Sequence, residues 1–224
     1  MKRPLFFAAL LLTSLAPLHS QIESGPTLPA FEAVMSDAKS AEIDGHKTIR
    51  VTKDPAVTKD DEPTYARLTG SNFQNGIIEA KVFSRLLTNA PDHARGFIGI
   101  AFRIDDSNSK FECIYLRPTN GRADDQIRRN RAIQYFSFPE YKFDRTRRET
   151  PAKYETYADM GLGEWIEMKI VVEGSKAALF LNKGNQPALI VNDLKHGADA
   201  KGAIGLWVDI GTEGFFRDVK ITSR

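Results

Sequence analysis

The sequence contains little cysteine and little histidine: Cys113 is its single cysteine, and four histidines are spread over 224 residues. One cysteine cannot form an intrachain disulfide or a thiolate metal cluster, and no two histidines have the spacing of metal ligands. Cys113 lies within an apolar run, where we expect a buried and unreactive thiol. The sequence therefore predicts a fold without disulfides and without a bound metal.

Motifs for nucleotide cofactors and for serine nucleophiles are also absent. The chain has no P-loop, no dinucleotide-binding fingerprint and no Gly-x-Ser-x-Gly elbow. The acidic run 105–109 lacks the alternating oxygen ligands and the glutamate of an EF-hand loop. A hairpin loop is therefore favoured over a calcium site, and no cofactor is predicted.

The sequence has no apolar run of membrane-spanning length. Lys2 and Arg3 precede the apolar stretch Leu5 to Leu15, and the segment Leu18-His19-Ser20 provides the exit after it. This stretch is too short to cross roughly 30 Å of hydrocarbon, and its arrangement is typical of a secretory signal peptide. We expect residues 1–20 to be a cleaved signal peptide, with a membrane anchor as the alternative. A secreted or periplasmic protein with no membrane span follows from the first interpretation.

An excess of charge of either sign is missing as well. The chain has 31 Lys and Arg against 29 Asp and Glu. The expected signal peptide removes Lys2 and Arg3, which leaves 29 residues of each sign. A protein that binds nucleic acid regardless of its sequence needs a net basic surface. Nucleic acid is therefore not a predicted partner.

Short β-strand patterns make up most of the chain. After a lead-in segment over 21–44, runs rich in Ile, Val, Phe and Tyr alternate with turn signals, without a long helical period. Gly174-Ser175 between two runs predicts a two-residue hairpin. The pattern predicts one all-β domain over 45–224, a β-sandwich. The predicted strands are Lys47–Thr52, Gly76–Ser84, Gly96–Arg103, Lys110–Arg117, Trp165–Glu173, Lys176–Asn182, Ala188–Asn192, Gly202–Asp209 and Gly214–Thr222.

Three of these strands, 96–103, 110–117 and 202–209, have two unlike faces. Side chains alternate between the faces of a strand, and on one face these strands carry mainly large apolar side chains, which belong in the sandwich core. On the other face, residues with little or no side chain are expected to form the floor of a concave surface. The floor residues are Gly99, Ala101 and Gly205, and the side chains expected to stand above them are Arg103, Tyr115, Arg117, Trp207 and Asp209.

The strand pattern breaks between Arg117 and Arg148, in a segment that contains eight arginines and several aromatic residues. Long loops in compact domains tend to be functional or disordered, and the aromatic content argues against disorder. Two interpretations stay open. The segment borders a ligand groove, or it covers Trp207 and Tyr115 as a second small core. In the second case its arginines would pair with Asp124, Asp125 and Asp144.

Several segments together resemble a known group of proteins. They include Ala-Arg-Gly-Phe-Ile-Gly-Ile-Ala-Phe-Arg (94–103), Gly-Glu-Trp-Ile-Glu-Met-Lys-Ile (163–170), Gly-Ala-Ile-Gly-Leu-Trp-Val (202–208) and Gly-Phe-Phe-Arg-Asp-Val-Lys-Ile (214–221). Over about residues 45–222 the sequence resembles the concanavalin A-like lectin/glucanase superfamily. Within it, the resemblance is to laminin-G-like domains and to the bacterial 3-keto-disaccharide hydrolase or family 16 glycoside-hydrolase-like domains. This resemblance implies a jelly roll of two antiparallel sheets whose concave face binds sugar.

The sequence departs from the glucanases at their catalytic motif, Glu-x-Asp-x-x-Glu. The partial match is Glu42-Ile43-Asp44, and Lys47 stands where the second glutamate would be. Glycoside hydrolysis by these enzymes needs two carboxyl groups, so ordinary family 16 catalysis is not expected. A cross-strand pair stays open, with Asp209, Glu213, Asp125 and Glu79 as candidates. Glu112 is expected to lie with the core residues, where a carboxylate needs a partner.

Carbohydrate is therefore the predicted partner. Aromatic rings offer flat apolar faces for a sugar, and arginines offer hydrogen bonds to hydroxyl or carboxylate oxygens. If the protein is an enzyme, Asp125 or Asp209 is expected to supply acid–base chemistry. The alternatives are a non-catalytic glycan-binding or adhesion module and a structural protein of the cell envelope. The residues expected to bind the ligand are Arg103, Tyr115, Arg117, Asn120, Arg122, Gln126, Arg128 and Trp207.

Overall fold

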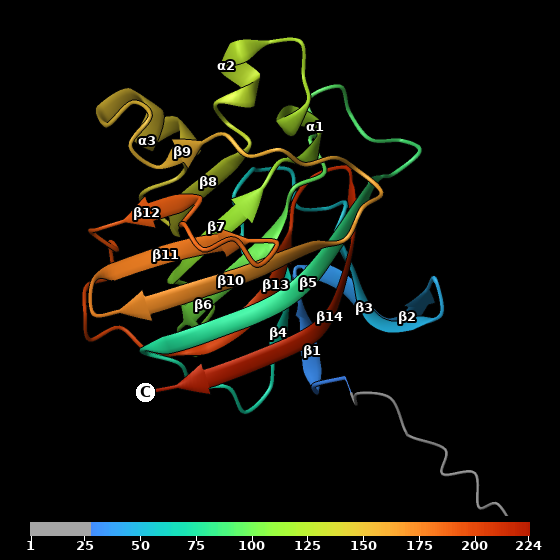
Figure 1. Ribbon diagram of the computed structural model, residues 1–224. Helices are drawn as coiled ribbons and strands as arrows, with labels where there is room; N and C mark the ends of the chain where they lie inside the picture. The colour runs from blue at the N-terminus through green and yellow to red at the C-terminus, as the bar shows by residue number, and fades with distance from the viewer. Residues whose placement is uncertain (1–27) are drawn as a thin grey trace, which may run out of the picture.

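The computed structural model describes residues 28–224, which form two antiparallel sheets of seven strands each, packed face to face (Figure 1). The expected signal peptide and the start of the lead-in segment lie outside the described residues. The first sheet, called sheet A, has the order β1 (Phe31–Val34), β4 (Tyr65–Leu68), β13 (Ala203–Val208), β6 (Ile98–Ile104), β7 (Phe111–Leu116), β8 (Ile133–Phe138) and β9 (Glu155–Thr156). The second, sheet B, has the order β12 (Leu189–Val191), β11 (Lys176–Leu181), β10 (Ile166–Glu173), β5 (Gly76–Leu86), β14 (Thr212–Ser223), β3 (His46–Lys53) and β2 (Ser36–Ile43).

The predicted all-β sandwich is confirmed, and the alternation of side chains explains how the two sheets pack. In β10 every second residue is buried, while the charged residues between them lie toward solvent. The buried sets of both sheets form one large apolar cluster between the layers. The predicted hairpin is present as well: Glu173 pairs with Lys176, and Gly174 has a φ of 55°, a left-handed conformation that glycine adopts readily.

Three strands of sheet A are buried along their whole length, on both faces: β6, β7 and β13. A strand at the surface of a two-layer sandwich normally has one face toward water. Because these three strands are buried on both faces, other segments of the protein cover the outer face of sheet A. The cover comes from the connections around sheet A, including three short helices: α1 (Pro118–Gly121), α2 (Gln126–Arg129) and α3 (Phe143–Glu149). Figure 1 shows these helices grouped at one end of the sandwich.

The structure differs from the sequence expectation in several segments, because β1, β2, β4, β8 and β9 were not among the predicted strands. The lead-in segment, expected to precede the domain, contributes β1 to sheet A and β2 to sheet B, so the sandwich extends back to residue 31. The segment 117–148, in which no strand was predicted, contains β8. Both faces of β8 are buried, so its sequence lacks the alternation by which a half-exposed strand is detected. Among residues 28–224, no helix combines the length and apolar character needed to cross a bilayer.

Arg103 does not stand on the outer face of sheet A, and the prediction that it does is wrong. Between the pairs Gly205–Ala101 and Ala203–Ile104, β6 has one residue more than β13, which is a β-bulge. Arg103 has a φ of 56° at this bulge, and the residues after it occupy the face opposite to the one that strict alternation predicts. Its buried guanidinium donates hydrogen bonds to the backbone carbonyls of Gln74, Gly174 and Gly197, at 2.7–3.0 Å.

Glu112 is buried between the sheets, as its position in the strand predicted. Its two oxygens accept hydrogen bonds from the hydroxyl of Tyr135, at 2.6 Å, and from the backbone nitrogen of His196, at 2.9 Å. These bonds attach the loop after β12 to sheet A. A buried carboxylate with both oxygens bonded is compatible with a stable core, and its role in this structure is to hold that loop.

We predict that Arg103→Met destabilises the fold. Methionine fills a similar space but leaves three partly buried carbonyl oxygens without the guanidinium donor, which is expected to lower the free energy of unfolding by about 3 kcal/mol. Urea denaturation followed by circular dichroism measures the change, with Arg148→Met at an exposed position as the control. Equal stability of the two variants would contradict a structural role for Arg103.

Candidate functional site

The outer face of sheet A carries a second apolar cluster instead of an open groove. Trp207 lies at its centre and is fully buried, with its ring centroid 4.8 Å from that of Tyr115 and 5.4 Å from that of Phe136. The indole nitrogen donates a hydrogen bond of 2.8 Å to the backbone oxygen of Glu62. The connection between β3 and β4 therefore lies across the face where a ligand was expected.

The strand alternation placed Tyr115 and Trp207 on the correct face, but the expectation that they stand above an open floor is wrong. Tyr115 is 1% exposed and Trp207 is 0% exposed, so neither offers a ring face for stacking. These rings are covered, but Glu62 of the connection between β3 and β4 accepts the hydrogen bond from Trp207, and segment 117–148 also lines the pocket described next. The arginines of segment 117–148 were expected to pair with Asp124, Asp125 and Asp144, but in the structure they contact other carboxylates. Those carboxylates are Glu140, Glu149, Glu155, Asp159 and Glu164.

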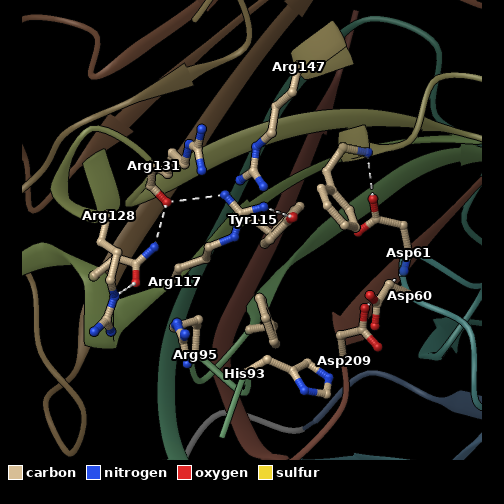
Figure 2. A pocket seen from close by; sticks show the side chains of 13 residues that line it. Asp60, Asp61, His93, Arg95, Tyr115, Arg117, Arg128, Arg131, Arg147 and Asp209 are labelled. Atoms are coloured by element: carbon tan, nitrogen blue, oxygen red, sulfur yellow. Dashed lines mark hydrogen bonds between the residues drawn. The ribbon is translucent and has the colours of Figure 1, made fainter. Parts of the chain in front are cut away.

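One pocket of about 410 Å³ remains where the cover from β3–β4 meets the helical segment (Figure 2). Arginines occupy one side of the view and the aspartates the other. The lining residues come from the ends of strands and from the connections that follow or precede them. They are Asp60, Asp61, His93, Arg95, Phe97, Tyr115, Arg117, Asn120, Arg128, Arg131, Phe143, Arg147 and Asp209.

On the basic side, three arginines share a single carboxylate, that of Glu155, which is itself buried. Arg147 contacts it through two nitrogens, Arg117 at 3.2 Å, and Arg131 at 3.7 Å. Arg117 also donates to the hydroxyl of Tyr115 and to the side-chain oxygen of Gln134. These contacts fix the position of Arg117 at the back of the pocket.

The other two arginines of this side, Arg95 and Arg128, make different contacts. Arg95 is half-buried and donates to the backbone oxygens of Asp92, at 2.6 Å, and Ala94, at 2.8 Å. Arg128 donates through Nε to the side-chain oxygen of Asn120, at 3.2 Å. Burial lowers the pKa of Arg95, and the positive charges of Arg128 and Arg117 lower it further.

On the acidic side, Asp209 and Asp61 are buried next to each other. Asp209 accepts from the ammonium of Lys53, from the backbone nitrogen of Asp61 at 2.9 Å, and from that of Ile210 at 2.7 Å. Asp61 accepts from the backbone nitrogen of Phe143, at 2.9 Å, which links the two covering segments. Burial and then the neighbouring Asp209 raise the pKa of Asp61 to about 7. Burial also raises the pKa of Asp209, although Lys53 opposes this effect.

The remaining predicted residues divide between the pocket and its surroundings. Arg117, Asn120, Arg128 and Asp209 line the pocket. Asp125 lies outside it and caps α2, accepting from the backbone nitrogen of Arg128 at 3.0 Å. Arg122 is exposed and paired with Asp159 and Glu164, and Gln126 is exposed and bonded to Asn130. The structure therefore brings together half of the predicted site.

Sequence reasoning missed several lining residues, namely Asp60, Asp61, His93, Arg95, Phe97, Arg131, Phe143 and Arg147. Most lie in loops or short helices, where the strand alternation gives no information about direction. The acidic run 60–62 and the mixed run 92–95 were the available signals. Among residues 28–224, no group of His, Cys, Asp or Glu side chains is arranged to hold a metal ion.

Comparison with known proteins adds evidence about the fold. The sequence matches no protein-family model and no curated protein. Among solved structures, the carbohydrate-binding module CBM66 from Bacillus subtilis superposes with a TM-score of 0.56 at 13% identity, over 88% of this chain and 100% of that one. This chain therefore shares the fold of that module, a sandwich of two antiparallel sheets.

Two further structures are similar at lower scores. A protein of unknown function with a galectin-like fold from Bacillus subtilis has a TM-score of 0.49 at 11% identity, covering 87% of this chain and 100% of that chain. A galectin from Caenorhabditis elegans has a TM-score of 0.39 at 11% identity, covering 70% and 94%. The likeness to CBM66 supports the predicted two-sheet β-sandwich, at the level of the fold. Similarity at this identity leaves the ligand to be argued from the pocket.

We predict that Asp61→Asn changes how stability depends on pH. The carboxyl has a pKa of about 7 in the folded protein and an ordinary value near 3.8 when unfolded, so the folded state binds the extra proton. Its contribution to stability is therefore complete below about pH 4 and is lost as the pH rises through 7. The difference between the two pKa values corresponds to at most about 4 kcal/mol.

Asparagine cannot ionise, and it tolerates the left-handed backbone of Asp61, whose φ is 53°. We expect the free energy of unfolding, measured by urea denaturation, to decrease less between pH 5 and pH 8 for Asp61→Asn than for the wild type. Asp124→Asn, an exposed change, is the control and should behave as the wild type. The groups facing Asp61 are Asp209, Lys142, Arg117 and the backbone of Phe143. The same pH dependence in all three proteins would refute the assignment.

Proposed function

We propose that the chain is an exported carbohydrate-binding protein and that sugar binds in the pocket lined by the arginines and aspartates. The observation that carries the proposal is the lining itself: guanidinium donors on one side, carboxylate acceptors on the other, and the half-buried ring of Phe97. Export is supported by the basic and apolar pattern of residues 1–20, and the fold shared with a carbohydrate-binding module is compatible with a sugar ligand.

A sugar hydroxyl both donates and accepts hydrogen bonds, so it is held well between a donor wall and an acceptor wall. Arginine groups present several donors in a fixed plane, and charged partners strengthen each bond. The volume of about 410 Å³ lies within the usual range of small-molecule sites. An apolar ring such as Phe97 can cover the C–H face of a sugar, which adds contact area and orientation.

We predict that Phe97→Ala weakens sugar binding about tenfold, the effect of losing roughly 1.4 kcal/mol of ring contact. The wild type is first screened on an array of neutral, acidic and 3-keto sugars, and the affinity of the best ligand is measured by isothermal titration calorimetry. The matched control is Phe180→Ala, a half-buried phenylalanine of sheet B in a different hollow. Absence of binding to every sugar, or an equal effect of both changes, would contradict the proposal.

A second candidate function is hydrolysis of the bound glycoside, and the position of Asp61 favours it. A carboxyl with a pKa of about 7 still carries its proton near neutral pH and can act as a general acid. Asp61 would protonate the leaving oxygen, and Asp60 would take a proton from the attacking water. Asp60 fits this role because its carboxylate has no bonding partner within residues 28–224, whereas Asp209 is held by Lys53.

We predict that Asp61→Asn and Asp60→Asn each lower the turnover of a hydrolysed glycoside at least 100-fold and lower its affinity by a much smaller factor, because the asparagine oxygen still accepts a hydrogen bond but cannot transfer a proton. Release of reducing sugar measures turnover, and calorimetry measures binding. Wild-type turnover in Asp61→Asn would exclude its role as the acid. A wild type that binds sugar and cleaves none would exclude hydrolysis and leave a binding protein.

A further inference from the structure

Arg95 and Arg128 differ from the other arginines of the pocket in their charge balance. Arg117, Arg131 and Arg147 share Glu155, whereas within residues 28–224 no carboxylate lies within ion-pair distance of Arg95 or Arg128. Arg95 uses one nitrogen, Nη1, for its two backbone contacts. Arg128 uses Nε for Asn120 and makes two long contacts, of 3.4 and 3.5 Å, to Thr119.

The two guanidiniums also face the same space. Both line the pocket, and Figure 2 shows Arg95 and Arg128 on its left side and the aspartates on its right. Their mutual repulsion contributes to the lowered pKa of Arg95. Like charges held together in a partly buried site are unfavourable in the empty protein. A ligand anion at this position would remove that repulsion and supply the acceptors that both groups need.

The opposite wall limits which anions fit. Asp60, Asp61 and Asp209 lie across the pocket, and Asp209 is held in its ion pair with Lys53. A compact, multiply charged anion would be repelled by this wall if it filled the pocket. A ligand that carries its negative charge at one end and hydroxyl donors at the other matches both walls.

We propose that the ligand is an acidic sugar, whose single carboxylate or sulfate group is bound by Arg95 and Arg128 while its hydroxyls donate to the aspartates. This inference rests on the proposed function, since it names the class of sugar that the same pocket accepts. The oxyanion is the shared chemistry of uronic acids and sulfated sugars, and the experiment separates the two sources.

The experiment uses matched sugars that differ in one group: galactose, galacturonic acid and galactose 6-sulfate, and the corresponding glucose series. Calorimetry on the full mature protein should show at least tenfold tighter binding of one acidic sugar than of its neutral counterpart. Tightest binding of the acid identifies a uronate site, and tightest binding of the ester identifies a sulfate site. Either result supports the inference, and the preference should shrink as sodium chloride is raised.

Variants then test the two residues. Arg95→Gln and Arg128→Gln should each lower the affinity for the acidic sugar at least tenfold and that for the neutral sugar by a clearly smaller factor, because glutamine keeps a donor but loses the charge. Arg148→Gln, an exposed change in the same arginine-rich segment, is the control and should alter neither. Thermal unfolding checks that each variant is folded. If one of the two arginine variants does not fold, the other one still tests the inference.

Three results would overturn the inference. Equal affinity for neutral and acidic sugars would show that the pocket does not recognise an anionic group, although it binds carbohydrate. If both variants still prefer the acidic sugar as strongly as the wild type does, Arg95 and Arg128 are not the residues that bind the anion. Inorganic sulfate bound as tightly as the sugar sulfate would show that the hydroxyls and the aspartate wall contribute nothing. In contrast, if the protein binds none of the sugars, the proposed function itself is wrong.

Discussion

The buried ion pair between Lys53 and Asp209 is the contact on which the outer face of sheet A depends. Lys53 ends β3 in sheet B, and Asp209 follows β13 in sheet A, so the pair joins the two layers. Lys53 also donates to the backbone oxygen of Lys59, and Asp209 accepts from the backbone of Asp61. Both contacts hold the connection between β3 and β4 across the sheet. Because removing one partner of a buried pair leaves an uncompensated charge, this arrangement has little freedom to open.

The same connection decides where a ligand can bind. By passing over Trp207, it converts the expected groove into a packed cluster and leaves space only at the end where it meets α3. The acidic wall of the pocket belongs to this connection and to the end of β13. The basic wall belongs to the segment between β7 and β9, where Glu155 positions Arg117, Arg131 and Arg147, and to Arg95 of the connection between β5 and β6. The charge separation in the pocket therefore results from basic and acidic connections that meet at one edge of sheet A.

Strand alternation was a reliable guide where pairing is regular and failed where it is not. It placed Gly99, Tyr115 and Trp207 on the outer face of sheet A and Glu112 between the sheets, as observed. It failed at Arg103 because one extra residue in β6 reverses every later side chain, and no feature of the sequence marks that bulge. The burial of the outer face could not be predicted from the sequence either. Glycines flanked by aromatic residues are compatible both with an open sugar groove and with a second buried core.

The sequence alone determined what depends on local pattern: an all-β chain, the positions of most strands, the hairpin at Gly174, and the absence of a disulfide framework. These follow because backbone geometry imposes a two-residue period and a defined turn on the residues themselves. The tertiary structure decided which residues meet in the pocket. Asp61, Arg95 and Arg128 come from three connections far apart in the chain. Their proximity, their charge balance and the raised pKa of Asp61 arise from burial and long-range packing, which have no signature in a local pattern.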